Sequence, residues 1–176
     1  MKQLLKYTIR LAVFILAQVY VLNQIPALHA YITPSIYFLF ILWLPFTISR
    51  GGLLLVSFIT GILLDFFMKT PGLHAAPCVL IGYLRPFFIN ILMPQQGVEF
   101  NYREPSALSL GLVQYMIYVA LLSFFHHLYL FTIEAFQFGD IIYLLSKTIG
   151  SLAISLLMIL VVEIIFIRKQ KFLTNT

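Results

Sequence analysis

Charged residues are scarce in this sequence, and acidic ones are the scarcest. Only 10% of the 176 residues are charged, with six aspartates and glutamates against eleven lysines and arginines, while 61% are hydrophobic. Soluble domains carry about a quarter of their residues as charges, so this composition excludes one. The longest polar stretch, Met93 to Pro105, is too short to fold as a separate catalytic unit. We therefore predict a single integral membrane domain over residues 1–176.

Several motifs are also missing. The lone Cys78 excludes an internal disulfide and argues against a cysteine metal site. Glycine-rich phosphate loops, HExxH pairs and GxSxG elbows do not occur. The basic residues flank apolar segments and form no separate face, which argues against nucleic acid as a partner. We therefore expect no metal, no cofactor and no nucleic-acid ligand.

Six apolar segments fill most of the length. A bilayer offers no water to stray backbone groups, so each segment should be an α-helix. The predicted fold is all-α, a polytopic transmembrane bundle of about six spans: Ile9–Ile25, Ser35–Ile48, Leu53–Met68, His74–Leu92, Leu108–Ile133 and Ile141–Ile167. The second and third are short and close together, so a thin helical hairpin that does not fully span is the alternative.

The basic residues predict the topology. Placing nine of the eleven on the cytoplasmic side leaves only Lys69 and Lys147 outside, a clear positive-inside bias. An even number of spans then puts both termini in the cytoplasm. The loop from Met93 to Pro105 is expected to face the cytoplasm, and the segment from Glu134 to Asp140 to face outward.

The third span carries an ordered polar face. Ser57, Gly61 and Asp65 recur every four residues, which places them on one side of a helix. Small residues at this spacing let a second helix approach closely. A carboxylate inside a membrane segment needs a partner or water, so we expect this face to be buried; the alternative is that Asp65 simply reaches the interface.

The turn after this span suggests the partner. Thr70 is expected to cap a helix whose first residue is Pro71, followed by Gly72 and with His74 in the first turn. The free N–H groups of that turn would face Asp65. We predict that Asp65 accepts from these donors and locks the two spans together as a hairpin, a contact we call the clasp.

Arg85 lies too far along the next span to reach Asp65, at roughly 16 Å from the turn. It follows Cys78 and Gly82 on one face and precedes Pro86. Two interpretations stay open: Arg85 extends toward the cytoplasmic interface, or it meets an acidic group of a partner protein.

A second polar group is expected on the outer half. His126, His127 and Glu134, together with His29 and Asp140, could line an outward-facing pocket. Imidazole and carboxylate suit zinc or proton transfer, but neighbouring histidines diverge by about 100° on a helix, so their spacing is a poor metal site. Interhelical hydrogen bonding is the simpler interpretation.

The motif residues resemble a known family. The run Gly61-Ile-Leu-Leu-Asp65-Phe-Phe, then Thr70-Pro-Gly-Leu-His-Ala-Ala and Tyr83-Leu-Arg-Pro86, resembles the rod shape-determining MreD family. The resemblance implies a small bundle, similar to the substrate-binding subunits of vitamin transporters, that binds the bitopic protein MreC. It also implies association with the actin-like MreB, the glycosyltransferase RodA and RodA's transpeptidase partner. Gly61, Asp65, Gly72 and His74 carry over as motif residues, without a catalytic role.

The lack of a soluble domain and the predicted clasp favour a non-catalytic scaffold. The resemblance implies that this scaffold serves the cell-wall elongation machinery in the bacterial inner membrane. Two other classes stay open. The outer polar group and the vitamin-transporter similarity suggest a small-molecule-binding subunit of a transporter. An intramembrane enzyme would instead use His126, His127 and Glu134.

Overall fold

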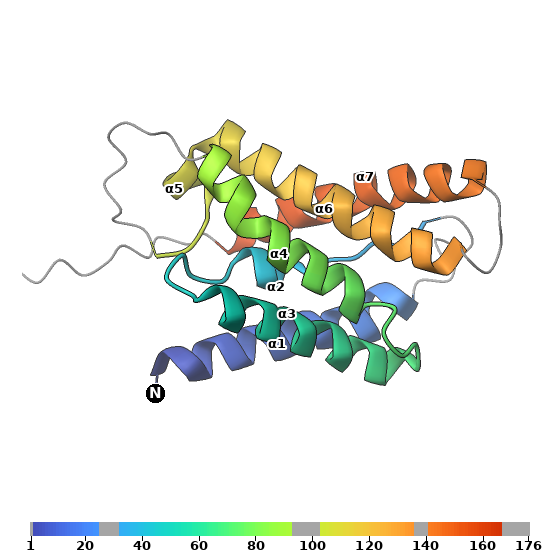
Figure 1. Ribbon diagram of the computed structural model, residues 1–176, viewed down its shortest axis with the longest axis horizontal. Coiled ribbons are helices and arrows are strands. Elements are labelled where there is room, and N and C mark those ends of the chain that lie inside the picture. The colour runs from blue at the N-terminus through green and yellow to red at the C-terminus, as the bar shows by residue number, and fades with distance from the viewer. Residues whose placement is uncertain (1, 25–31, 93–102, 136–140, 167–176) are drawn as a thin grey trace, which may run out of the picture.

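The computed structural model describes residues 2–24, 32–92, 103–135 and 141–166, and within them it is helical, without strands. The elements are α1 (Lys2–Tyr20), η1 (Leu22–Gln24), α2 (Leu39–Leu42), α3 (Arg50–Met68), α4 (Ala75–Leu92), α5 (Ala107–Leu110), α6 (Leu112–Ala135) and α7 (Ile141–Ile165) (Figure 1). The helices α1, α3, α4, α6 and α7 are long and apolar enough to cross a membrane. The predicted all-α, multi-pass bundle is confirmed.

The long helices pack in the order α1, α3, α4, α6, α7. Figure 1 shows that α1 and α3 begin, and α4 and α7 finish, at the same end of the bundle. We call this the basic end, because Lys6, Arg10, Arg50 and Arg103 lie there, and the opposite end, where α3 turns into α4, the hairpin end. The described chain therefore begins and finishes at the basic end.

The second predicted span does not form a long helix. Residues 32–49 return from the hairpin end to the basic end as turns and extended chain around the one-turn helix α2 (Figure 1). Pro34 and Pro45 lie on either side of α2 and limit how far a helix can extend between them. The residues from Ile36 to Leu44 are at most 6% exposed. Their apolar character therefore reflects burial in the protein core, because irregular backbone at membrane depth is tolerated only inside protein.

The fifth predicted span, Leu108–Ile133, is interrupted near its start. Gly111 has a φ of +88°, a conformation that favours glycine, and it separates α5 from α6. Ser106 begins α5 with a reciprocal cap: its hydroxyl accepts from the Ser109 N–H, and the Ser109 hydroxyl accepts from the Ser106 N–H.

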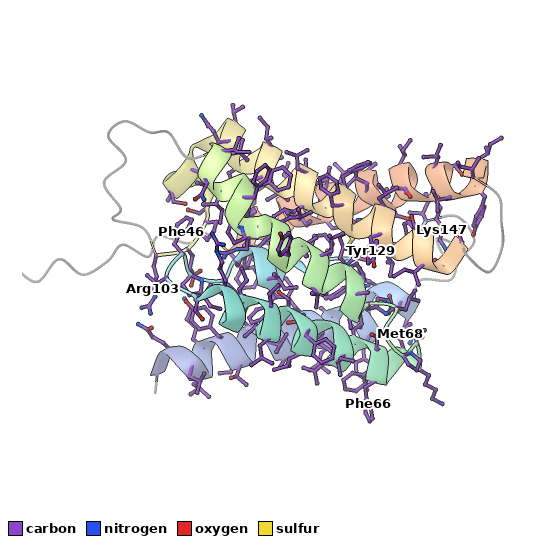
Figure 2. The ribbon with its side chains drawn as sticks, viewed as in Figure 1. Phe46, Phe66, Met68, Arg103, Tyr129 and Lys147 are labelled. Atoms are coloured by element: carbon purple, nitrogen blue, oxygen red, sulfur yellow. The ribbon has the colours of Figure 1, made fainter. Side chains whose placement is uncertain are left out.

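The segment before α5 is fixed to α1. Glu104 is 3% exposed and accepts hydrogen bonds from the Tyr7 hydroxyl and the Arg10 guanidinium, both at 3.0 Å. The Lys6 ammonium lies 3.6 Å from the same carboxylate. Arg103 and Phe46 lie beside one another at this end (Figure 2), where the Arg103 carbonyl accepts from the Phe46 N–H. At the basic end, a buried carboxylate therefore joins the segment before α5 to two cations of α1.

Some predicted features lie outside the described residues. These are the span ends Ile25 and Ile167, the outer residues His29 and Asp140, and residues 93–102 of the predicted cytoplasmic loop.

Candidate functional site

The α3 and α4 helices approach one another closely along the predicted small-residue face. A Cβ atom added to Gly61 would lie 2.3 Å from the Cα of Ala75, and one added to Gly82 would lie 2.3 Å from the Ser57 hydroxyl oxygen. At Gly61 the added atom would meet the backbone at the start of α4, so no larger residue fits there without moving a helix, whereas at Gly82 it would meet the Ser57 side chain. Ser57 and Gly61 are buried, as is Asp65 at 4% exposure. The prediction of a buried Ser57, Gly61 and Asp65 face is confirmed.

The clasp is present at the hairpin end. One oxygen of Asp65 accepts from the His74 N–H at 2.9 Å and from the Thr70 hydroxyl at 3.0 Å, and the other accepts from the Ala75 N–H at 3.0 Å. The His74 ring nitrogen Nδ1 lies 2.8 Å from the first oxygen. The Asp65 carboxylate therefore holds the turn between α3 and α4 in place. The alternative, that Asp65 merely reaches the interface, is wrong.

The start of α4 differs from the prediction. The helix begins at Ala75, and residues from Pro71 to His74 form turns with a φ of +82° at Gly72. Thr70 does not cap a helix that starts at Pro71, because its hydroxyl donates to Asp65 instead. The Asp65 carboxylate accepts from the N–H groups at the start of α4 instead. It therefore acts as an N-terminal cap that another helix supplies. Lys69, whose backbone has a φ of +57°, ends α3, and its side chain is exposed.

Arg85 lies inside the bundle, so both interpretations of it are wrong: it neither extends toward the interface nor presents its charge to a partner protein. It is 2% exposed, donates from Nε to the Tyr118 hydroxyl at 3.2 Å and donates from Nη2 to the carbonyl of Leu44. The Tyr118 hydroxyl in turn donates to the Leu42 carbonyl at 3.0 Å. Arg85 therefore satisfies the irregular chain after α2, whose carbonyls have no continuous helix to accept them.

The extended chain before α2 is held by serines of α7. The Ser151 hydroxyl accepts from the Thr33 N–H at 2.9 Å, and the Ser155 hydroxyl accepts from the Ser35 N–H at 2.8 Å. Both serines are fully buried. Thr33 and Ser35 are two residues apart in extended chain, and Ser151 and Ser155 are about one helical turn apart, so the two pairs have nearly the same separation. The two hydroxyls of α7 can therefore accept from both backbone N–H groups.

Gln18 holds the same chain from the side of α1. Its amide oxygen accepts from the Ile36 N–H at 2.9 Å, and its amide nitrogen donates to the Pro34 carbonyl at 3.0 Å. The side chain is 2% exposed. A glutamine within an apolar span is the sequence signal that indicates such a role.

Trp43 fixes the other end of this chain. Its indole N–H lies 3.0 Å from both the Tyr115 hydroxyl and a Glu163 carboxylate oxygen, and the Tyr115 hydroxyl donates to the same carboxylate. Phe14 packs edge-on against the Trp43 ring at 5.4 Å. Residues 32–44 are therefore fastened by side chains of α1, α4, α6 and α7, and we call them the core segment.

The predicted outer pocket residues have separate partners. His126 and His127 are fully buried; Nε2 of His126 lies 2.8 Å from the Tyr37 hydroxyl, and Nε2 of His127 lies 3.1 Å from the Ser155 hydroxyl. Glu134 pairs instead with Lys147 at 2.6 Å. Lys147 lies at the hairpin end in Figure 2. These three residues do not line one outward pocket, because the two rings join α6 to the core segment and α7.

Two cavities lie toward the basic end. One, of about 400 Å³, lies between α5, α6 and α7, and its wall is apolar apart from a few polar groups such as Glu163. The other, of about 450 Å³, is a groove between the start of α3 and the second half of α4. Across the described ranges, no group of three or more histidine, cysteine or carboxylate side chains is placed to hold a metal ion.

Fold and contacts together define a multi-pass helical membrane protein, and its described residues include two internal polar systems, the clasp and the hydrogen-bonded core segment. Comparisons with protein-family models, with curated proteins and with solved structures returned no match.

Proposed function

We propose that this protein is a non-catalytic scaffold of the cell-wall elongation machinery in the bacterial inner membrane, and that it binds MreC. The observation that carries the proposal is the clasp. Gly61, Asp65 and His74, three of the four residues that carry the resemblance to the MreD family, meet where α3 turns into α4. The fourth, Gly72, lies in the turn between the two helices. A sequence motif whose members touch one another is stronger support for a family resemblance than the same letters scattered over the fold.

The use of the polar side chains also supports a scaffold. Asp65, Arg85 and Gln18 are buried and hydrogen-bonded to backbone groups of this chain. Such contacts hold one arrangement of helices and leave the outer helix faces for neighbours. Under this proposal the basic end lies in the cytoplasm, where MreB would approach, while RodA and its transpeptidase partner would contact the helix faces in the membrane.

Complementation in a rod-shaped bacterium tests the proposal. Depletion of the protein is expected to round the cells, and MreC is expected to copurify with the wild-type chain. Asp65→Ala should fail to restore rods and should retain less MreC, whereas Lys69→Gln, an exposed change four residues away, should behave as wild type. Rod-shaped depleted cells, together with absence of MreC from the purified protein, would contradict the scaffold.

A small-molecule-binding subunit of a transporter is the second candidate, and the cavity between α5, α6 and α7 favours it. Its volume of about 400 Å³ falls within the range of ligand pockets. This candidate predicts a stoichiometric small molecule in the purified protein, detectable by native mass spectrometry. Filling the cavity with Val119→Trp should expel that molecule; an empty wild-type cavity would remove the candidate.

A further inference from the structure

The groove between α3 and α4 combines an apolar wall with polar groups at two depths. Its polar lining is Arg50 at the start of α3, with Asn90 and Tyr83 on α4, and its apolar wall includes Leu54 and Phe87. Figure 1 shows that the start of α3 and the last turns of α4 both lie at the basic end. The groove therefore runs from the membrane surface at the basic end into the bundle's flank.

The α4 side of this groove is a regular stripe. Tyr83, Phe87 and Asn90 are spaced i, i+4 and i+7, and all three are exposed, Tyr83 at 71%. This spacing is the one by which one helix lies along another. The stripe spans two turns, roughly 10 Å at about 1.5 Å per residue.

Arg50 supplies a positive charge at the surface end, and no described carboxylate pairs with it. Its side chain is exposed, and within the described part of the chain no acidic residue lines the groove. The four described carboxylates have other partners: Glu104 pairs with cations of α1, Glu134 pairs with Lys147, Glu163 accepts from Trp43 and Tyr115, and Asp65 lies at the opposite end. A ligand that carries an anionic group at this depth complements the groove.

Tyr83 supplies a hydroxyl donor near the middle of the membrane. The α4 helix has 18 residues, a length of about 27 Å that matches the hydrocarbon core, and Tyr83 is its ninth residue. Its hydroxyl has no hydrogen-bond partner among the residues that the structure describes. A phenol at this depth needs an acceptor, and a lipid tail has none to offer, whereas a helix offers polar side chains.

We propose that this groove docks a single transmembrane helix of the partner protein, which carries an acidic residue at the cytoplasmic surface and a hydrogen-bond acceptor about two turns deeper. The acidic residue pairs with Arg50 and the deeper acceptor takes the Tyr83 hydroxyl proton, while the stripe packs along the helix. This inference rests on the proposed function, in which the partner is MreC, a bitopic protein with a single transmembrane helix. Exposed arginine and tyrosine are also the residues that most often anchor interfaces.

Site-specific photocrosslinking tests the docking position in the intact membrane, with MreC coexpressed. A photoreactive residue at Phe87 in the groove is compared with one at Leu157 on α7, because the two native side chains are similarly exposed, at 59% and 63%. We expect the MreC helix to crosslink from Phe87 at least about ten times more than from Leu157, as a specific interface requires.

Two matched pairs of variants test the chemistry by the amount of MreC that copurifies. Tyr83→Phe removes only the hydroxyl and should weaken the complex about fivefold, the effect of one lost hydrogen bond, while Tyr129→Phe on α6 should not. Arg50→Glu should weaken it at least about tenfold, while Lys69→Glu at the hairpin end should not. A lysine in place of the acidic residue on MreC should restore the complex with Arg50→Glu.

The outcomes separate this inference from the proposed function. Full copurification of MreC with crosslinks from Leu157 and none from Phe87 would overturn the groove and leave the scaffold intact. Absence of MreC altogether would overturn both. Crosslinks from Phe87 to a second copy of this chain, or an acidic phospholipid that is retained by the wild type and lost in Arg50→Glu, would replace the helix with another occupant and overturn the inference.

Discussion

The α3–α4 hairpin and the core segment both place polar contacts inside a membrane bundle, but they obtain their partners differently. In the hairpin, Asp65 accepts from residues five to ten positions later in the chain. In the core segment, the backbone depends on side chains as far as 120 positions away. The hairpin is therefore a local unit, whereas the core segment forms only when α1, α4, α6 and α7 are together.

This difference has a physical cause. A helix satisfies its own backbone, so α3 and α4 need only a few polar contacts at their turn. An irregular segment offers unsatisfied N–H and carbonyl groups along its length, and each one needs a partner from elsewhere. The apolar side chains of the core segment fill the bundle while the polar side chains of its neighbours complete its backbone. We therefore expect the two regions to lose stability for different reasons. The hairpin should be destabilised by added bulk or by loss of the carboxylate, and the core segment by loss of single hydroxyls.

The largest effect is expected from Gly61→Ala. The added methyl group would meet the backbone of Ala75, which cannot move without separating α3 from α4, so we expect a loss of about 3 kcal/mol in the free energy of unfolding. Gly51→Ala is the matched control on the same helix, because its added Cβ meets no atom within 4 Å. Denaturation with sodium dodecyl sulphate in micelles measures both. Equal stabilities for the two variants would show that the close approach is not required.

Removal of the clasp carboxylate should have a somewhat smaller effect. Asp65→Ala leaves the N–H groups of His74 and Ala75 without their acceptor, so we expect a loss of about 1 to 3 kcal/mol. Phe66→Ala is the control, because Phe66 is 79% exposed and points away from the bundle (Figure 2), and it should change stability by less than about 0.5 kcal/mol. Unaltered melting of Asp65→Ala in detergent would refute the clasp.

Loss of one hydroxyl at the core segment should have the smallest effect of the three. Ser155→Ala removes the acceptor of the Ser35 N–H and the partner of His127, and we expect a loss of about 1 to 2 kcal/mol. Ser146→Ala on the same helix is the control, because that serine is exposed and bonds only within its own helix. Hydrogen exchange should reveal the change at Ser35 first. If the Ser35 amide exchanges at the same rate in both serine variants, the segment is held by packing alone.

The clasp could be predicted from the sequence because its information is local. An acidic residue in line with two small residues, followed by a tight turn, limits the partners of Asp65 to a few nearby donors. The prediction failed in detail at Thr70, because a carboxylate competes better than a hydroxyl for the N–H groups at the start of α4.

The core segment could not be predicted in the same way. Arg85 donates to the Leu44 carbonyl, and every residue type has a carbonyl, so residue identity does not reveal that acceptor. The apolar stretch from Ser35 to Ile48 is compatible with either lipid or protein surroundings, and only its position among four helices decides between them. Ser151 and Ser155 are four residues apart and so share one face of α7, but nothing in the sequence indicates that this face meets an extended chain.

The central claim is that the chain crosses the membrane between α1 and α3, through the core segment. Single cysteines at Val21, after α1, and at Ser49, before α3, test it directly, because both positions are exposed and lie on either side of the segment. With Cys78 replaced by alanine, a membrane-impermeant thiol reagent added to oriented vesicles should label the two positions from opposite faces. Labelling of both from the same face would contradict the claim.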